Sequence, residues 1–330
     1  MQNRKNVWQK KARSEKTMRS RVVVMGTTDF AVPMLNRLVD SDYEVVAVVC
    51  QPDRPNGRGK KMRALPMKQR ALELGLSVYQ PEKIRNVSAI NYLKSLRPDF
   101  FVVAAYGQIL SQEVLDIPTY GCLNIHGSLL PEYRGAAPVH HAIIDGKAES
   151  GVTIMKMDLG MDTGDMLAQK IIPITDTTTV GKMHDAMAAA GAGLILNVMA
   201  QIQNGTAQGI EQDSAKATYA EKIDKNTGRI DWHQSCFQIL RRINGTDPWP
   251  GAWTTLDGKT LKCFSPVRLP QAEKTEVPGC IVAADENQGF VVAAGDGYLQ
   301  LNEIQMPGKR RMQATDYFRG NAIAVGTVLS

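Results

Sequence analysis

Apolar runs and amphipathic segments alternate along the N-terminal part of the chain. Short runs rich in branched apolar residues have the pattern of strands buried on both faces; they lie at 21–25, 45–49, 100–104 and 122–126. Segments with helical periodicity lie at 30–38, 66–75, 87–96 and 180–200. The alternation predicts an α/β fold with a doubly wound, mostly parallel, Rossmann-like sheet. Strands at 151–157 and 166–172 are expected to continue that sheet.

The pattern changes near residue 204. Residues 204–226 are polar and lack a long periodic run, so they are interpreted as a linker. Beyond them, short apolar runs alternate with Gly- and Pro-containing turns, which predicts a small OB-like β-barrel. The predicted parts of the chain are an N-terminal extension, a catalytic domain, the linker and the barrel; they cover 1–20, 21–203, 204–226 and 227–330.

The net positive charge is concentrated at the N-terminus. The chain has a formal net charge of +6, and residues 1–20 carry seven basic groups and one acid, so the remainder balances to zero. The extension is interpreted as a flexible, solvated tail. An RNA-contacting arm and an organelle-targeting segment remain alternatives. A nucleic-acid interface elsewhere must depend on local basic clusters rather than on the overall charge.

Composition narrows the class of protein. No apolar stretch approaches the 18 residues of a membrane span, so no membrane association is expected. The five cysteines are widely spread and form no C-x-x-C pair, which argues against a disulfide scaffold and a cysteine zinc site. These features predict a cytoplasmic enzyme or binding protein without a metal.

The most informative chemistry lies at the end of the strand at 122–126. Asn124 and His126 are two residues apart, so they share one face of that strand. In an open α/β sheet, ligands bind beyond the carboxyl ends of the strands. An amide can donate to a developing oxyanion, and an imidazole can stabilise it or move a proton. Two polar residues that merely cap the strand remain the alternative.

Two loops extend this candidate site. A Gly- and Pro-containing loop follows His126, and a glycine-rich acidic turn at 158–165 separates the two later strands. Asp162 in that turn is placed to approach His126. A calcium-binding interpretation fails because the turn lacks the EF-hand spacing and is flanked by strands.

These residues lie in motifs that resemble the 10-formyltetrahydrofolate-dependent formyltransferase family, and specifically its members that act on methionyl-tRNA. The central match is N-I-H-G-S-L-L-P-E-Y-R-G-A-A-P at 124–138, followed by M-D-L-G-M-D-T-G-D at 157–165. Further collinear matches include G-T-T-D-F-A-V-P at 26–33, V-A-A-Y-G-Q-I-L at 103–110 and P-W-P-G-A-W at 248–253. The resemblance covers residues 21 to about 325. Asp247 departs from it, since an asparagine is expected there.

The resemblance implies the site residues position by position. It implies that Asn124, His126 and Asp162 are catalytic. The first two would stabilise the tetrahedral oxyanion, and Asp162 would orient the imidazole and relay a proton. The implied contacts to the folate cosubstrate are Ser128, Leu129, Leu130, Pro131, Gln108, Ile109 and Leu110. No metal is implied.

A basic, glycine-containing loop follows the second strand. It carries Arg54, Arg58, Lys60, Lys61 and Arg63. A solvated charge run is one interpretation. In the family it resembles, this loop enters the acceptor stem of initiator tRNA, with Arg58 at the key position. The implied reaction transfers the formyl group of 10-formyltetrahydrofolate to the α-amine of methionyl initiator tRNA, by a monomer with no further partner.

Three other functions remain open from the sequence. A formyltransferase for a small amine would need neither the second domain nor the basic loop. A nicotinamide-dependent dehydrogenase would need the G-x-G-x-x-G fingerprint, which is missing after the first strand. A non-catalytic tRNA-binding module would not need Asn124, His126 and Asp162.

Overall fold

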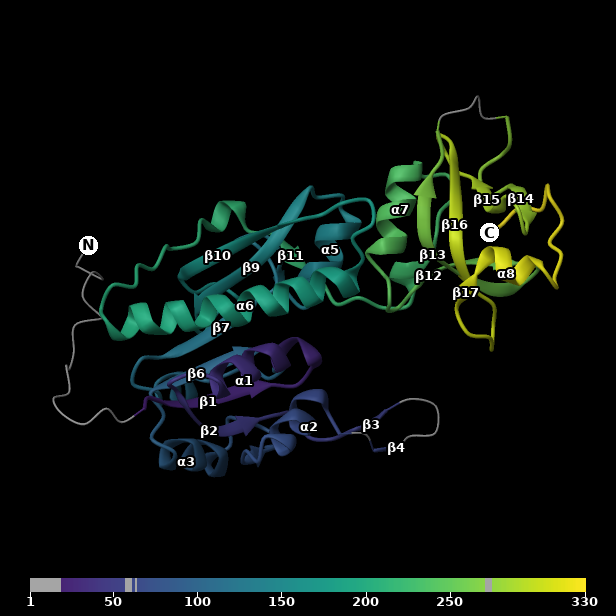
Figure 1. The fold of residues 1–330 in the computed structure, drawn as a ribbon. Helices are drawn as coiled ribbons and strands as arrows, with labels where there is room; N and C mark the ends of the chain where they lie inside the picture. Colours follow the sequence, from purple (N-terminus) through teal and green to yellow (C-terminus); the bar gives the residue numbers. More distant parts are fainter. Residues whose placement is uncertain (1–18, 57–60, 63, 271–274) are drawn as a thin grey trace. The chain divides into compact units, whose positions relative to one another are not determined.

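The computed structural model describes residues 19–56, 61–62, 64–270 and 275–330 (Figure 1). The predicted N-terminal extension therefore lies almost wholly outside the described residues. The chain forms two compact units. The first unit contains the residues up to Arg134, together with Gly151–Ile171 and Asp185–Thr218. The second contains Gly135–Ser150, Ile172–His184 and Tyr219–Ser330.

A seven-stranded sheet forms the centre of the first unit, in the order β10-β9-β7-β6-β1-β2-β5 (Figure 1). Its strands are β1 (Arg21–Gly26), β2 (Glu44–Val49), β5 (Val78–Tyr79), β6 (Phe100–Ala104), β7 (Cys122–His126), β9 (Glu149–Lys156) and β10 (Met166–Pro173). The pairs that join β5, β2, β1, β6 and β7 are parallel, whereas β7 and β9 are antiparallel. The predicted mostly parallel sheet is confirmed.

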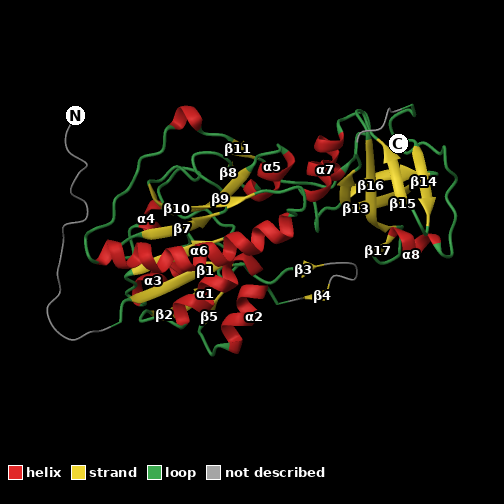
Figure 2. Cartoon of the chain, turned by 45° about the horizontal axis from the view of Figure 1, so that its top comes forward, coloured by secondary structure: helices red, strands yellow, loops and turns green. Residues whose placement is uncertain are grey.

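Helices accompany this sheet (Figure 2). They are the 3₁₀ turn Asp29–Ala31 and the helices α1 (Val32–Val39), α2 (Pro66–Glu73), α3 (Val87–Ser95), α4 (Gln112–Leu115) and α6 (Val180–Gln203), whereas α5 (Pro138–Ile144) belongs to the second unit. Every residue of β6 is buried, as expected for a parallel strand that is covered on both faces. The loop predicted at 53–65 contains a two-residue hairpin, β3 (Pro55–Asn56) with β4 (Lys61–Met62).

The helix α6 is long and apolar enough, by length and composition alone, to cross a membrane. Its contacts are instead those of a core helix. A Cβ added at Gly191 would come within 2.5 Å of Ile125 and 3.3 Å of Val152, so the helix backbone lies directly on β7 and β9. Along the same stretch, Met187, Ile195 and several neighbours are buried within the protein.

The second unit, for which a small OB-like β-barrel was predicted, contains an antiparallel sheet. The path is β12-β13-β16-β15-β14, and β17 pairs with β16. The strands are β12 (Ala252–Leu256), β13 (Lys259–Arg268), β14 (Ile281–Asp285), β15 (Gly289–Ala293), β16 (Tyr298–Gln305) and β17 (Met312–Gln313). The helices α7 (Cys236–Asn244) and α8 (Ala314–Phe318) and a 3₁₀ turn at Asn226–Gly228 also belong to the second unit. Elsewhere, β8 (Arg134–Gly135) pairs with β11 (Tyr219–Ala220), and a 3₁₀ turn at Ser214–Lys216 lies in the first unit.

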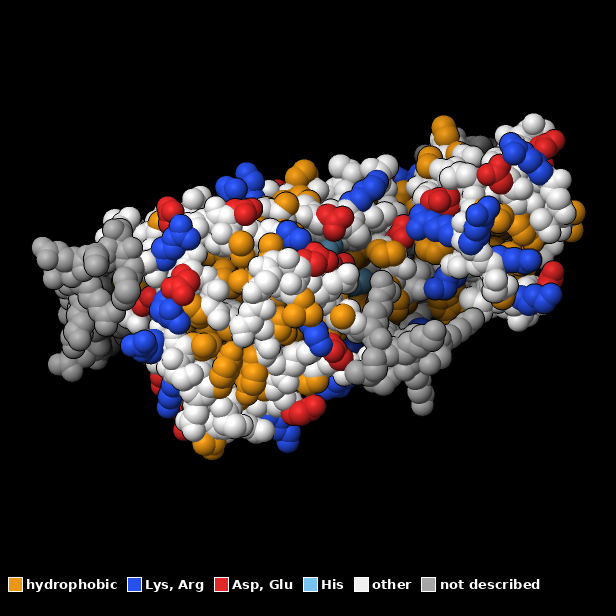
Figure 3. All heavy atoms as spheres, turned by 60° about the horizontal axis from the view of Figure 1, so that its bottom comes forward, with side chains coloured by type: hydrophobic (Ala, Val, Ile, Leu, Met, Phe, Trp, Pro, Cys, Tyr) orange, Lys and Arg blue, Asp and Glu red, His pale blue; other side chains and the backbone are white. Residues whose placement is uncertain are grey.

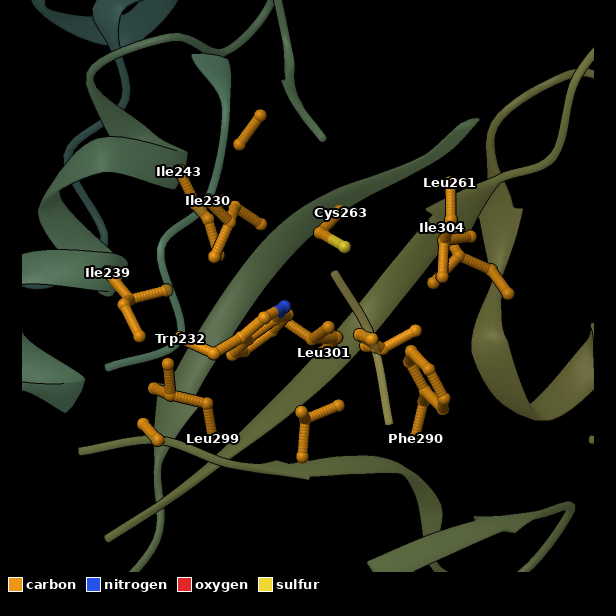
Figure 4. Packing of buried hydrophobic residues seen from close by; sticks show 14 of the residues in the cluster. Ile230, Trp232, Ile239, Ile243, Leu261, Cys263, Phe290, Leu299, Leu301 and Ile304 are labelled. Carbon is orange, nitrogen blue, oxygen red and sulfur yellow. The ribbon is translucent and has the colours of Figure 1, made fainter. Parts of the chain in front are cut away.

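Apolar side chains from these elements form the core of the second unit (Figure 4). The Trp232 indole is buried in this cluster and donates through Nε1 to Thr254 Oγ1 at 3.0 Å. The helix α7 contributes Ile239 and Ile243 from one face. Its start is fixed by a capping box, in which Ser235 and Gln238 exchange hydrogen bonds with each other's backbone.

Candidate active site

The strand β7 lies beside the point where the order of the parallel strands reverses. The chain runs outward from β1 through β2 to β5, and then returns to β6 and β7 on the other side of β1. Open α/β sheets bind ligands at such a reversal, beyond the carboxyl ends of the strands. Asn124 and His126 lie in the C-terminal half of β7. Asn124 pairs with Val103 of β6 and with Met155 of β9, and His126 pairs with Thr153 of β9.

The His126 imidazole is buried, and its two ring nitrogens have different surroundings. Nε2 lies 2.9 Å from the Tyr133 carbonyl oxygen, and Nδ1 lies 3.6 Å from Asp162 Oδ2. A carbonyl only accepts hydrogen bonds, so Nε2 carries the proton in either charge state of the ring. Nδ1 is therefore the ring nitrogen that faces the Asp162 carboxylate. The structure thus brings the predicted His126 and Asp162 together.

The Asp162 loop connects β9 to β10 in a tight conformation. Asp162 has φ +55°, a left-handed conformation that costs energy for any residue other than glycine. A Cβ added at Gly164 would lie 1.7 Å from the Lys156 carbonyl oxygen, so only glycine fits there. Asp158 Oδ1 accepts hydrogen bonds from Gly160 N and from Thr163 Oγ1. The loop holds Asp162 in one place through these local constraints.

The segment 128–131 is anchored to β9 and β10. Ser128 is fully buried and its hydroxyl donates to the Glu132 carbonyl at 2.6 Å. Leu130 is buried as well, and its N–H donates to Thr153 Oγ1. Gln169 Nε2 donates to the Leu130 carbonyl at 2.9 Å. Leu129 and Pro131 are only partly buried, so they are the two side chains of this predicted folate segment that remain open to a ligand.

The segment 108–110 combines structural and exposed residues. Gln108 Oε1 accepts from Ile84 N, and its Nε2 donates to the Pro81 carbonyl, so this side chain holds the neighbouring loop. Leu110 is buried in the apolar core. Ile109 is 85% exposed and lines the pocket described next.

A pocket of about 1010 Å³ opens beside these residues, within the first unit. It is lined by residues that follow the ends of β1, β2, β5 and β6 and by residues of α2; among them are Thr27, Gln51, Arg54, Gln69, Lys83 and Gln108. Thr27 Oγ1 donates to the Tyr106 carbonyl at 2.8 Å, which ties the end of β1 to the end of β6. The pocket therefore lies at the strand-order reversal, and it combines basic, amide and apolar walls.

The basic loop is described only in part. Arg54 is exposed and lines the pocket. Arg58, Lys60 and Arg63 lie outside the described residues, and Lys61 is described only as part of β4. Before the loop, Asp53 is bound by Lys68 Nζ and by Gln80 Nε2. The hydrogen bond from Lys68 lowers the pKa of the Asp53 carboxyl, so the base of the loop is held by an ionised pair.

The sequence interpretation missed contacts that reach the site from distant segments. The Tyr133 carbonyl and the Thr153 hydroxyl had no recognisable signal, because a backbone acceptor or a lone threonine in a strand is common. Gln212 donates to the Asp162 carbonyl from the segment that was interpreted as a linker. Among the residues that the structure describes, no group of three or more His, Cys, Asp and Glu side chains is arranged to hold a metal ion.

The sequence matches the formyl transferase family over residues 18–199 and the C-terminal domain of formyl transferases over 222–322. A methionyl-tRNA formyltransferase of Alkaliphilus metalliredigens is 47% identical over 309 residues, which cover 94% of this chain and 98% of that relative. The methionyl-tRNA formyltransferase of Bacillus licheniformis is 46% identical, with the same two coverages. The chain belongs to the methionyl-tRNA formyltransferase family.

Two solved structures share the fold of this methionyl-tRNA formyltransferase family member. An N-formyltransferase from Helicobacter canadensis, solved with folinic acid and dTDP-3-aminofucose, has a TM-score of 0.64 at 19% identity, and covers 89% of this chain and 100% of its own. HypX from Aquifex aeolicus, solved with tetrahydrofolic acid, has a TM-score of 0.63 at 16% identity, and covers 90% of this chain and 46% of its own. The expected family, fold class and formyl-transfer activity are confirmed; the individual site residues stay predictions.

Proposed function

We propose that this formyltransferase moves the formyl group of 10-formyltetrahydrofolate to the α-amine of methionyl initiator tRNA, with Asn124, His126 and Asp162 as its catalytic residues. The observation that carries the proposal is the buried His126 imidazole between the Tyr133 carbonyl and the Asp162 carboxylate. An imidazole that is held in place between a carbonyl and a carboxylate is suited to stabilise a developing oxyanion.

In the proposed reaction, the methionyl amine attacks the formyl carbon, and the formyl oxygen gains the electron pair of the C=O bond. Asn124 donates a hydrogen bond to that oxyanion, and the charged His126 stabilises it. Asp162 holds the imidazolium and takes part in moving the amine proton through water. Collapse of the tetrahedral centre breaks the bond to folate N10, which receives the proton as it leaves. No net oxidation occurs.

The proposed position of the folate follows from the pocket beside β6. Ile109 is exposed and lines that pocket. Leu129 and Pro131 are outside its lining, in the loop that follows His126, and they are partly exposed. All three side chains offer apolar contacts suited to a flat ring. Gln108 and Ser128 already bond to protein groups, and Leu110 and Leu130 are buried. Gln108, Ser128, Leu110 and Leu130 therefore contribute by holding the shape of the site. Backbone N–H and C=O groups of the two segments would supply the polar contacts.

The direct test is formyl transfer from 10-formyltetrahydrofolate to methionyl initiator tRNA, methionyl elongator tRNA and a panel of small amines. Rapid transfer to initiator tRNA alone supports the proposal. Transfer to a small amine would keep the folate chemistry and overturn the acceptor. Tight tRNA binding without transfer to any acceptor would point to a non-catalytic tRNA-binding protein. The proposal includes a monomeric enzyme in the cytoplasm, without membrane association.

The proposed tRNA contact in the first unit is the basic loop, with Arg54 at the pocket and Arg58 further along. Replacing Arg58 by Ala is expected to raise KM for tRNA about 10-fold, because a phosphate or base contact of an arginine is lost. The slope of log K for tRNA binding against log salt concentration should decrease in magnitude by about 1, while kcat at saturating tRNA stays unchanged. Arg37→Ala, the same charge change at an exposed position of α1, is the control. Equal effects of both changes would contradict a specific role for the loop.

A second proposed contact lies in the second unit, around Trp249. This indole is 54% exposed. Its turn is held by Lys262 Nζ, which donates to the Pro250 carbonyl, and by Arg311, which donates to Asp247 Oδ1 at 2.8 Å. The Arg311 guanidinium also lowers the pKa of the Glu303 carboxyl. The rigid turn therefore presents an aromatic face to solvent.

Basic side chains lie near this turn. Lys262 pairs with Gln305 across β13 and β16, and Gln305 Nε2 donates to the Lys309 carbonyl. Lys309 and Arg310 are exposed in that segment. Basic and acidic side chains are interspersed over the visible described surface (Figure 3), so this local combination of indole and cations is the feature that favours RNA. Arg241, by contrast, is buried and bonds to the Thr175 carbonyl.

Replacing Trp249 by Ala is expected to weaken tRNA binding about 10-fold, since stacking of one base on an indole contributes about 1–3 kcal/mol. Trp249→Phe keeps an aromatic face and should retain most of the affinity. Equilibrium binding of initiator tRNA at fixed salt measures both. An alanine variant that binds tRNA as tightly as the parent would exclude stacking at this position.

A further inference from the structure

Gln212 connects the Asp162 loop to a buried arginine within the first unit. It lies between α6 and β11 and is buried. Its Nε2 donates to the Asp162 carbonyl at 2.8 Å and to the Gly164 carbonyl at 2.7 Å. Its Oε1 accepts from Arg134 Nε at 3.1 Å and Nη2 at 2.8 Å. One amide group thus makes four hydrogen bonds inside the protein.

The chemistry at this position requires an amide. The Asp162 and Gly164 carbonyls only accept, so they need an N–H donor, whereas the Arg134 guanidinium only donates and needs an oxygen. Arg134 is 3% exposed, and a buried guanidinium without an acceptor is strongly destabilising. A carboxylate would accept from the arginine but repel the two carbonyl oxygens. A cation would donate to the carbonyls but repel the arginine. Glutamine serves both sides at once.

The two carbonyls that Gln212 holds are those on either side of Thr163. They fix the peptide planes of the loop at Asp162, whose φ of +55° is costly without support. The direction of the Asp162 side chain depends on those planes, and its Oδ2 faces His126 Nδ1. Local constraints from Asp158 act on Gly160 and Thr163, whereas Gln212 contacts Asp162 itself from a segment 50 residues away.

We propose that Gln212 is a positioning residue for formyl transfer, which bridges the buried Arg134 to the Asp162 loop and thereby aims the Asp162 carboxylate at His126. The inference rests on the proposed function of Asp162. It assigns a role in the reaction to the segment between α6 and β11. The same segment reaches the 131–134 region through Thr218, whose Oγ1 accepts from Tyr133 N at 2.8 Å.

The test separates positioning from folding by means of Gln212→Glu. Glutamate keeps the acceptor for Arg134, so the fold is expected to persist, but it sets an oxygen against two carbonyl oxygens. kcat should fall about 10- to 100-fold, because a small displacement of a catalytic group has effects of that size. KM for initiator tRNA should stay within about twofold, since the tRNA contacts are elsewhere. Gln212→Met, which gives up all four hydrogen bonds at similar length, should lose at least as much kcat.

Gln208→Glu is the matched control, because Gln208 is exposed in the same segment and undergoes the same charge change. It should keep the parent kcat. The decisive comparison places Gln212→Glu in an Asp162→Asn background, where a positioning residue has nothing left to aim and no further loss of kcat is expected. Thermal unfolding measured on each variant reports the fold independently.

Each outcome has a distinct meaning. An Asp162→Asn enzyme with full activity would overturn the proposed function of Asp162, and the inference with it. An Asp162→Asn enzyme of reduced but measurable kcat, together with a folded Gln212→Glu enzyme of parent kcat, would overturn the inference alone. A loss from Gln212→Glu that is equally large in both backgrounds would show a general structural role and would also overturn positioning.

Discussion

Replacing His126 by Gln is expected to reduce kcat for formyl transfer by about 10²- to 10⁴-fold, the range associated with general acid–base groups. The glutamine side-chain amide can still donate to the Tyr133 carbonyl, as Nε2 does in the parent at 2.9 Å. It cannot titrate, however, and it offers no nitrogen that becomes charged beside Asp162. Single-turnover formylation of methionyl initiator tRNA measures the effect on chemistry without interference from product release.

The second unit provides a matched control for this change. His233 Nδ1 lies 3.2 Å from Asp231 Oδ1, so it is also a histidine–aspartate pair, but its side chain is 82% exposed. His233→Gln should leave kcat unchanged, because a solvated pair does not face a reacting group. A His126→Gln enzyme that retains more than about a tenth of the parent kcat would contradict proton transfer or charge stabilisation at this ring.

Much of the first sheet was predictable because its strands are short, apolar and bounded by turns. The predicted strand at 122–126 coincides with β7, and the predicted strand at 100–104 coincides with β6. The second unit was harder to predict. The apolar run at 277–283 predicts a strand, which is observed at Ile281–Asp285, because residues 278 and 279 form a turn that leads into it. The helix α7 was missed although Ser235 and Gln238 have the spacing of a capping box.

In the candidate site, some residues could be predicted from the sequence and others could not. Asn124 and His126 could be located from the sequence because polar residues at the end of an apolar strand stand out. The partners that orient them could not be found, since they are backbone carbonyls or side chains far along the chain, such as Gln212. The sequence also does not show whether the adjacent Arg241 and Arg242 support the fold or contact RNA. Arg241 is buried against Asp176 at 3.5 Å, and only the packed structure reveals that it supports the protein.

Replacing Trp232 by Ala is expected to destabilise the second unit by about 3–5 kcal/mol, as is typical when a large aromatic side chain is removed from a core. The indole is 3% exposed within the cluster of Figure 4 and lies near Leu301. Its Nε1 also donates to Thr254 Oγ1, which is fully buried and would lose a partner. A loss of this size is a large share of the roughly 5–15 kcal/mol that stabilises a typical domain.

Scanning calorimetry of the whole chain measures this change, because a chain with two compact units can unfold in more than one transition. Trp249→Ala is the control of the same chemical type, and its 54% exposure predicts a change within about 0.5 kcal/mol. The two variants should therefore separate the functions of two tryptophans in one unit. Trp232→Ala should lower the unfolding temperature, whereas Trp249→Ala should keep it and weaken tRNA binding. A Trp232→Ala protein as stable as the parent would mean that the core repacks around the missing ring, which the density of contacts around Trp232 argues against.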